Sequence, residues 1–144
     1  MKTIKCLSIK QPFAEWILQG IKVREHRSYP IKFRGIIVIH SSMKPDTEFM
    51  KKYGISPEGF KNGHLLGIAR ITEQIQYGPG DYAWLINPIC FLKTPIFYKG
   101  KLGLWDLDIE EIKKQIPDEF IKIHQHEASY INKYEANYIE QKQE

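Results

Sequence analysis

The sequence predicts an α+β fold built on a small β-barrel or a strongly bent sheet, with one helix between the first two strands and helices at the C-terminal end. Short stretches with strand-like patterns are separated by turn signals, and few helical patterns lie among them. The last part of the chain, in contrast, has helical periodicity. With 144 residues, 42% of them hydrophobic and 26% charged, the chain suits one domain that buries one core.

The first part of the chain is expected to form two strands with a helix between them. Residues 4–9 alternate loosely between apolar and polar side chains, which is typical of a strand. Pro12 suits the first turn of a helix and Gly20 its end, and Trp16 falls on the apolar face expected to join the core. Residues 36–39 are apolar on both faces and therefore predict a buried strand.

The remaining elements follow from the same signals. Asp46 is expected to cap a short helix over residues 47–53. After the last strand, helices are expected over residues 109–116 and from 118 to about 139, with a break at Pro117. The further strands are expected at residues 65–72, 82–86, 91–92, 96–98 and 104–107.

Charge is distributed unevenly along the chain. Residues 1–72 hold 13 Lys and Arg against 5 Asp and Glu, whereas residues 73–144 hold 8 against 12. Such an asymmetry indicates a basic face that can meet a polyanion. The chain has no apolar run close to the ~18 residues that span a membrane and no secretory signal near its start. We therefore expect a cytoplasmic protein that contacts no membrane.

No metal or cofactor is expected. Cys6 and Cys90 lie far apart in apolar stretches, and we expect both to be reduced, buried side chains. The pair His124 and His126 falls on different faces of a helix and is expected at the surface. None of these spacings matches a metal site.

The segment 22–29 carries the candidate functional residues, because it is extended and almost wholly polar. In a strand, Glu25 and Arg27 share one face, whereas Lys22 and Arg24 lie on the other. One interpretation is an edge strand protected by its charges. The alternative is a strand that lines a polar cleft, where Glu25 and Arg27 orient each other beside Lys22. Such a group can hold a phosphate, read a base edge, or supply a base and an electrostatic stabiliser.

The pattern Gly20-x-Lys22-x-x-Glu25-x-Arg27 resembles the G-x-K-x-x-E-x-R signature of the ASCH domain, the activating signal cointegrator homology domain. The resemblance covers roughly residues 4–107. It implies a PUA-like fold, a small β-barrel related to modules that bind RNA and read modified bases. It also implies a cleft beside the first helix, lined by the signature. Similar flanking segments are residues 7–14, 33–42, 66–69, 82–85 and 95–105.

The resemblance also bears on function. Many ASCH relatives are thought to bind RNA or DNA, and we expect an intracellular nucleic-acid-binding domain, most readily for RNA or a modified nucleotide. The alternative is a hydrolase, an amidohydrolase or ribonuclease acting on a nucleoside or RNA, with Lys22 and Glu25 in its active site and Glu73 as a candidate second acid. Some small bacterial relatives hydrolyse an acylated cytidine with Lys, Thr and Glu. Lys22 matches that Lys, but Glu25 stands where the Thr would be, and a carboxylate cannot act as its hydroxyl does.

The expected nucleic-acid contacts surround this segment. Glu25 and Arg27 shape the pocket, while Ser8 and Gln11 either bond a ligand or serve as a cap and a solvated side chain. His40 ends a buried strand, where a structural histidine is favoured over a catalytic one. The residues expected to meet phosphate are Lys10, Lys22, Arg24, Lys32 and Arg34.

We expect residues 1–107 to form the domain and residues 108–144 to form a helical extension that packs on it. The extension carries an apolar stripe at intervals of three, four and seven residues. Docking on the barrel is one interpretation of the stripe, and a homodimer contact is the other. The stripe consists of Phe120, Ile123, Tyr130, Ile131, Tyr134 and Tyr138.

Overall fold

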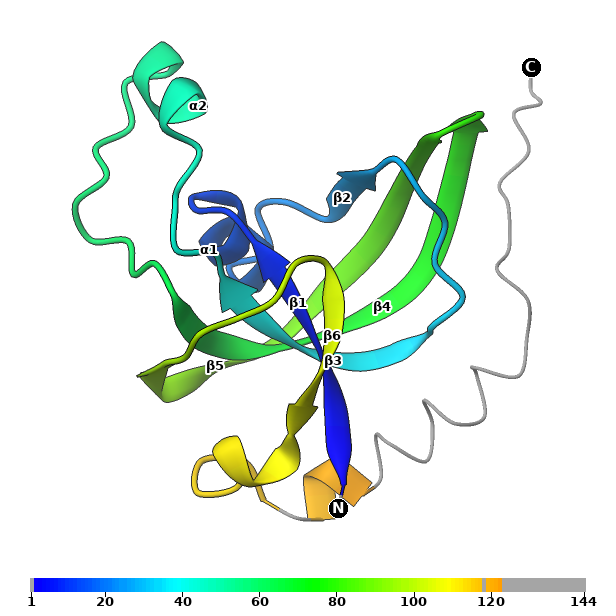
Figure 1. Cartoon of the computed structure of the whole chain (residues 1–144), viewed down its shortest axis with the longest axis vertical. Helices are drawn as coiled ribbons and strands as arrows, with labels where there is room; N and C mark the ends of the chain where they lie inside the picture. Colours follow the sequence, from blue (N-terminus) through cyan, green and yellow to red (C-terminus); the bar gives the residue numbers. More distant parts are fainter. Residues whose placement is uncertain (1, 118, 123–144) are drawn as a thin grey trace.

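The computed structural model describes residues 2–117 and 119–122. Within them, six strands form one mixed sheet in the order β2-β5-β4-β3-β1-β6, accompanied by short helices, so the predicted α+β class is confirmed (Figure 1). β1 pairs in parallel with β3 and antiparallel with β6. The strands are β1 Thr3–Ile9, β2 Arg24–Arg27, β3 Gly35–Ser41, β4 His64–Gly78, β5 Asp81–Phe97 and β6 Leu104–Asp108, and the helices are α1 Phe13–Leu18, α2 Thr47–Lys52 and the 3₁₀ turn η1 Ile109–Glu111.

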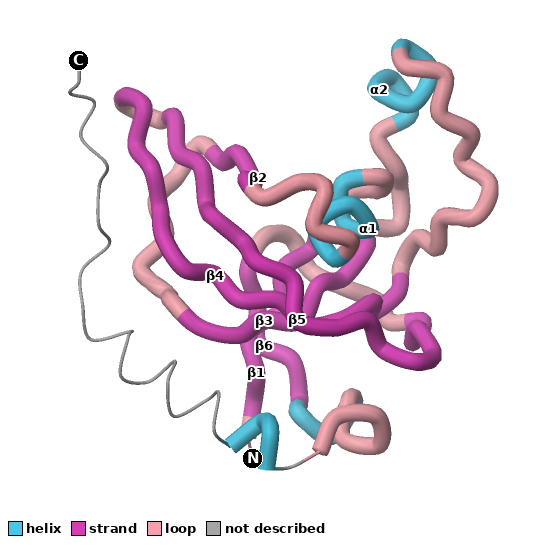
Figure 2. Tube along the Cα trace, turned by 180° about the vertical axis from the view of Figure 1, so that it is seen from behind, coloured by secondary structure: helices cyan, strands magenta, loops and turns pink. Residues whose placement is uncertain are grey.

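The expected barrel is not closed. Among the described residues, β2 and β6 are the two edges of the sheet and do not pair with each other. The long hairpin of β4 and β5 curves, as Figures 1 and 2 show from opposite sides, and carries the four-residue strand β2 along its length. Arg27 of β2 then donates a hydrogen bond to the main-chain oxygen of Ser8 in β1, at 3.1 Å. A side chain, rather than main-chain pairing, therefore bridges β2 and β1.

Two strands are longer than the sequence predicts. β4 continues to Gly78, past the expected end at residue 72, and the three strands expected within residues 82–98 are largely one strand, β5. Pro88 and Pro95, which fall between the three expected strands, lie inside it. The β4–β5 ladder shifts register at four places, and such bulges allow a strand to run through residues that cannot donate a hydrogen bond.

Apolar clusters cover both faces of the sheet. One cluster joins a face of the sheet to α1 and contains Leu7 and Trp84 from the strands and Ile17 from the helix. The other contains Cys6 and Trp105, and the segment that follows β6 closes it. β3 is buried along its whole length, as the apolar pattern of residues 36–39 predicts.

The segment after β6 is not the α-helix expected over residues 109–116. It forms η1 and turns, and Asp108 accepts a hydrogen bond from the main-chain nitrogen of Glu110. Its apolar side chains nevertheless bury on the sheet: Ile109 and Ile112, three residues apart, align in a 3₁₀ turn, and Ile116 belongs to the same cluster. Of the helix expected from residue 118, the structure describes residues 119–122. The remaining stripe residues lie outside the described residues: Ile123, Tyr130, Ile131, Tyr134 and Tyr138.

The helices lie close to their predicted positions. α1 ends before Gly20, which has a φ of +79°, a conformation that favours glycine. Asp46 caps α2 by accepting a hydrogen bond from the main-chain nitrogen of Phe49. Trp16 is half-buried rather than part of the core, because α2 covers it only partly: its ring lies 5.9 Å from that of Phe13 and 5.8 Å from that of Phe49.

Candidate functional site

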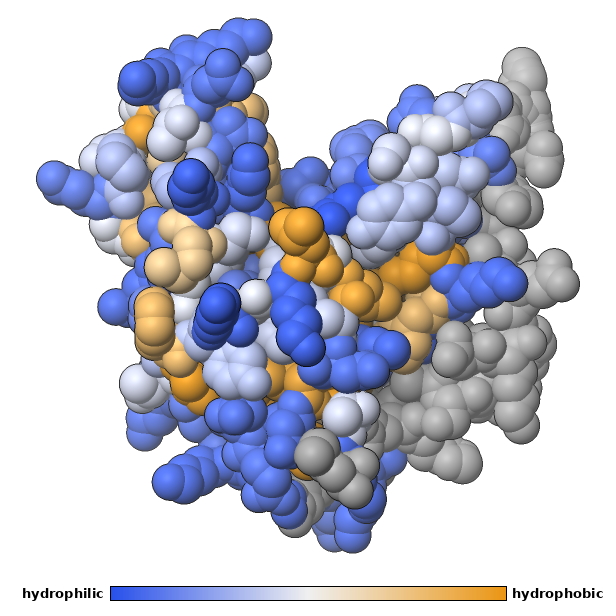
Figure 3. All heavy atoms as spheres, viewed as in Figure 1, coloured by the Kyte–Doolittle hydropathy of each residue, from blue (hydrophilic) through white to orange (hydrophobic). Residues whose placement is uncertain are grey.

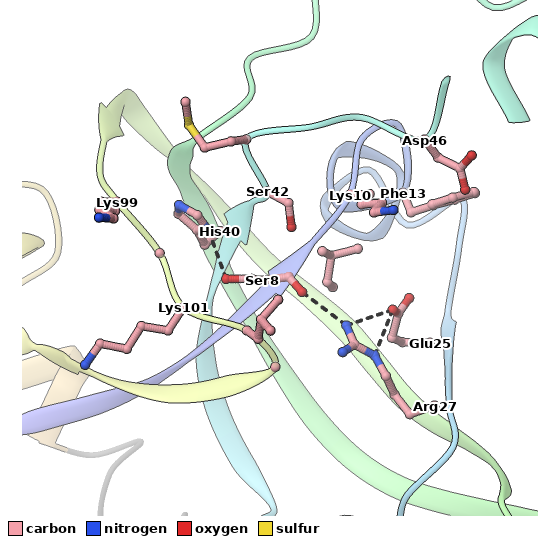
Figure 4. Close-up of a pocket in the computed structure, with 15 residues that line it drawn as sticks. Ser8, Lys10, Phe13, Glu25, Arg27, His40, Ser42, Asp46, Lys99 and Lys101 are labelled. Atoms are coloured by element: carbon pink, nitrogen blue, oxygen red, sulfur yellow. Dashed lines mark hydrogen bonds and ion pairs between the residues drawn. The ribbon is translucent and has the colours of Figure 1, made fainter. Parts of the chain in front are cut away.

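A cavity of about 680 Å³ lies where β1, β2 and β3 meet the segment between β5 and β6. The face seen in Figure 3 is hollowed between α2 and the tip of the β4–β5 hairpin. Residues of the predicted site that line the cavity are Ser8, Lys10, Glu25 and Arg27 (Figure 4). This volume lies within the range of pockets that hold small ligands, of order 300–1,000 Å³.

Glu25 and Arg27 form an ion pair in the lining of the cavity. The Nε and Nη2 atoms of Arg27 lie 3.1 and 3.0 Å from Oε2 of Glu25, and Nη2 also donates to the Ser8 carbonyl. The guanidinium carbon lies 5.5 Å from the centre of the Trp84 ring, a cation–π contact. β2 is a charged edge strand, as the first interpretation predicts, and its half-buried face lines a cavity, as the second predicts, although the lining is more apolar than the expected polar cleft.

Lys22 adjoins this pair from outside the cavity lining. Its Nζ lies 3.7 Å from Oε1 of Glu25 and 5.5 Å from the centre of the Phe13 ring, and it donates to the main-chain oxygen of Arg24. The ammonium is thus held at the edge of the site, where it adds positive charge beside Glu25.

Ser8, His40 and Trp105 form a buried hydrogen-bonded chain across β1, β3 and β6. Nε2 of His40 lies 2.8 Å from the Tyr98 carbonyl, which can only accept, so Nε2 carries the proton. Burial lowers the pKa of His40, an effect that the bond to Tyr98 partly offsets, and the neutral ring accepts at Nδ1 from the Ser8 hydroxyl, 3.0 Å away. Nε1 of Trp105 donates to Oγ of Ser8 at 2.9 Å. His40 is therefore fully satisfied, as expected of a structural histidine.

The segment between β5 and β6 contributes cavity residues that sequence reasoning missed. Lys99 and Lys101 are exposed and line the cavity. A Cβ atom on Gly100 would lie 2.3 Å from the His40 ring, so only glycine fits this close approach. The carbonyl of Gly103 accepts a hydrogen bond from the main-chain nitrogen of Ser8. In the sequence, Gly100 and Gly103 on either side of Lys101 could have indicated that this segment packs closely.

Arg34 lies outside the cavity lining, although its charge suggested a phosphate contact. It is 4% exposed, and Nη1 donates to the carbonyls of Ile31 and Phe33. Burial lowers the pKa of its guanidinium, partly offset by the nearby carboxylate of Glu73. Glu73, the candidate second acid, is exposed on β4 and also lies outside the lining.

Three other predicted residues also lie away from the cavity lining. Gln11 is buried rather than solvated, and Nε2 donates to the Lys61 carbonyl at 3.0 Å. Arg24 is exposed and donates to the Tyr77 hydroxyl on the outer face of β2. Lys32 is exposed in the segment that leads to β3.

Within the described part of the chain, no group of three His, Cys, Asp or Glu side chains could hold a metal ion, and His124 and His126 lie beyond it. Both cysteines are free. Cys6 is buried, and burial raises the pKa of its thiol, whereas Cys90 is half-buried rather than fully buried as expected. None of the described helices combines the length and the apolar character needed to cross a membrane.

Comparison with known protein families identifies the family to which this chain belongs. The model of the ASCH domain matches residues 7–143, which is nearly the whole chain and runs past the segment 4–107 that carries the resemblance in sequence. No curated protein gave a match. Because the family match covers the sheet, the cavity and the segment after β6, this chain belongs to the ASCH domain family.

Proposed function

We propose that the protein binds single-stranded RNA in the cavity between β1, β2 and the segment 99–103. ASCH domains are PUA-like domains that are generally thought to bind RNA. The observation that carries the proposal is that three exposed lysines, Lys10, Lys99 and Lys101, line the same cavity as the Glu25–Arg27 pair. Lysines around one cavity neutralise the phosphates of a strand bound there, whereas the polar groups inside meet the rest of a nucleotide.

The interior of the cavity supports a single strand rather than a duplex. Apolar side chains, among them Ile9, Phe13 and Leu102, line it beside the polar pair. A base removed from its stack offers ring faces to apolar groups and hydrogen-bonding edges to polar ones. A base within a duplex is stacked on both faces and paired on its Watson–Crick edge. A cavity of about 680 Å³ also holds only a small part of a duplex.

The proposal is tested by removing the three lysines together. Fluorescence anisotropy with a labelled single-stranded RNA compares the wild type with the triple variant Lys10→Ala, Lys99→Ala, Lys101→Ala over a range of salt concentrations. We expect at least tenfold weaker binding at low salt and a shallower salt dependence, by about 2 in the log–log slope, because each phosphate contact releases roughly 0.7 counterion.

The matched control removes the same charge elsewhere. Lys51, Lys93 and Lys114 are exposed and lie outside the cavity lining. Their triple alanine variant should retain most of the affinity and the wild-type salt slope. Binding that does not change with salt, or an equal loss in both triple variants, would reject the cavity as the RNA site.

A hydrolase is the second candidate, and the contact between Lys22 and Glu25 is the observation that favours it. A carboxylate beside an ammonium can serve as a general base. The wild type, Lys22→Ala and Glu25→Gln would be incubated with acylated nucleosides and with RNA, and products followed by chromatography. Turnover by the wild type that both variants abolish would favour the enzyme over the binding domain.

A further inference from the structure

The rim and the interior of the cavity differ in charge. Lys10, Lys99 and Lys101 are exposed around it, whereas Glu25, whose side chain is 13% exposed, lies inside. A phosphate that entered as far as Arg27 would have to compete with Glu25 for the guanidinium and would meet the repulsion of its carboxylate. The phosphate of a bound nucleotide therefore favours the lysines, and the interior favours a neutral group that donates hydrogen bonds.

One oxygen of Glu25 remains able to accept such a bond. Both contacts from Arg27 end on Oε2. Among the described residues, Oε1 accepts no hydrogen bond, and its ion-pair partner, Nζ of Lys22, is 3.7 Å away. Figure 4 shows the carboxylate pointing from β2 toward the part of the cavity where Lys10 and Phe13 lie. An ionised carboxylate only accepts, so it selects ligands that carry an N–H or O–H at this point.

Arg27 makes this selection sharp by holding the carboxylate still. Its two bonds to Oε2 and its bond to the Ser8 carbonyl fix the guanidinium between β2 and β1. Glu25 is therefore held in one orientation before a ligand binds. Binding then does not lose the conformational entropy of this side chain. Arg27 acts here as a positioning residue for Glu25.

Building on the proposed function, we propose that the cavity takes one unpaired base that carries an exocyclic amino group, with Oε1 of Glu25 accepting a hydrogen bond from that amine. Carboxylates accept from the N4 amine of cytosine in this way. Uracil presents a carbonyl oxygen at the same position, which a carboxylate repels. The site therefore discriminates between two pyrimidines of the same size on the same phosphate backbone.

The test compares labelled oligo(C) and oligo(U) of eight nucleotides by fluorescence anisotropy at neutral pH. We expect the wild type to bind oligo(C) about tenfold more tightly, the worth of one hydrogen bond to a charged group. Glu25→Gln should bring the ratio close to one, because an amide can turn to offer either a donor or an acceptor. Glu58→Gln, which changes an exposed carboxylate outside the cavity lining, should keep the wild-type ratio.

The outcomes separate this proposal from the one on which it rests. Equal, salt-dependent binding of both oligonucleotides by the wild type overturns base selection and leaves RNA binding in place. A tenfold preference that survives in Glu25→Gln overturns the role of Glu25. No binding of either oligonucleotide rejects both proposals. If a melting curve shows that Glu25→Gln does not fold, the wild-type ratio alone decides whether the base is selected.

Discussion

Arg27 and Arg34 both lie in the basic first half of the chain, yet the fold uses them differently. Arg27 lies in a strand, pairs with Glu25 and lines the cavity. Arg34 is buried beside β3 and bonds the carbonyls of its own segment, and within the described residues its Nη2 atom has no hydrogen-bond partner. A count of positive charges therefore does not locate an anion site. What each guanidinium already binds, and whether it faces solvent, decides its role.

The largest difference between the two arginines is expected in RNA binding. Arg27→Met removes the anchor of Glu25 and leaves its carboxylate unbalanced inside the cavity, where it repels phosphate, so the variant should bind single-stranded RNA about 30-fold more weakly, or by roughly 2 kcal/mol. Arg34→Met should change the affinity less than twofold. Anisotropy titrations at low salt measure both. Equal losses would show that general charge, not the cavity, governs binding.

A smaller effect is expected on stability, and here Arg34 is the arginine whose replacement should matter. Arg34→Met leaves the carbonyls of Ile31 and Phe33 without their donors, while it also removes a buried N–H without a partner. The net loss should be about 1 kcal/mol in the free energy of unfolding, measured by urea denaturation. An unchanged midpoint would mean that these two hydrogen bonds contribute nothing to the fold.

The smallest effect concerns the pH dependence of stability beneath the cavity. Burial lowers the pKa of His40 in the folded state, and the charge of His64 adds to that effect, whereas the bond to Tyr98 opposes it. The unfolded chain therefore binds the proton more readily, so stability should fall as the pH drops below about 6.5.

His40→Gln provides the reference for this prediction. Denaturation curves between about pH 7.5 and 5.5 should show a steeper loss of stability in the wild type than in the variant. Parallel curves would mean that another group governs the pH dependence. Arg34 stays charged when it is buried. His40, in contrast, is neutral in the folded protein, and for that reason it makes stability depend on pH.

Much of the fold follows from local patterns. The alternation in β1, the doubly apolar β3 and the cap at Asp46 are local signals, and the structure contains each element. The continuity of β5 could not be predicted, because Pro88 and Pro95 suggest ends and only pairing with β4 across several bulges carries the strand past them. The sheet is open because its end strands, β2 and β6, do not pair with each other, and alternation within a strand does not reveal which strands pair.

The candidate site was predictable where it depends on one strand. Glu25 and Arg27 are two residues apart, so a strand places them on one face whatever the rest of the fold does. Lys99 and Lys101 reach the cavity because Gly100 packs against His40, a contact between distant segments. Arg34 was predicted at the surface because it is charged, but it is buried. Its burial depends on tertiary packing, which the local sequence does not reveal.

The pairing of β1 with β6 has a consequence for the order in which the protein is built. Thr3 lies opposite Asp108, so this ladder must wait until about 100 further residues have been synthesised, and closing so long a loop slows its formation. Until then one side of β1 is an unpaired edge, which is prone to pair with other chains. The carbonyl of Gly103 and the indole of Trp105, both bonded to Ser8, arrive in the same late segment. The nascent chain therefore completes the cavity in the same step that protects it from aggregation.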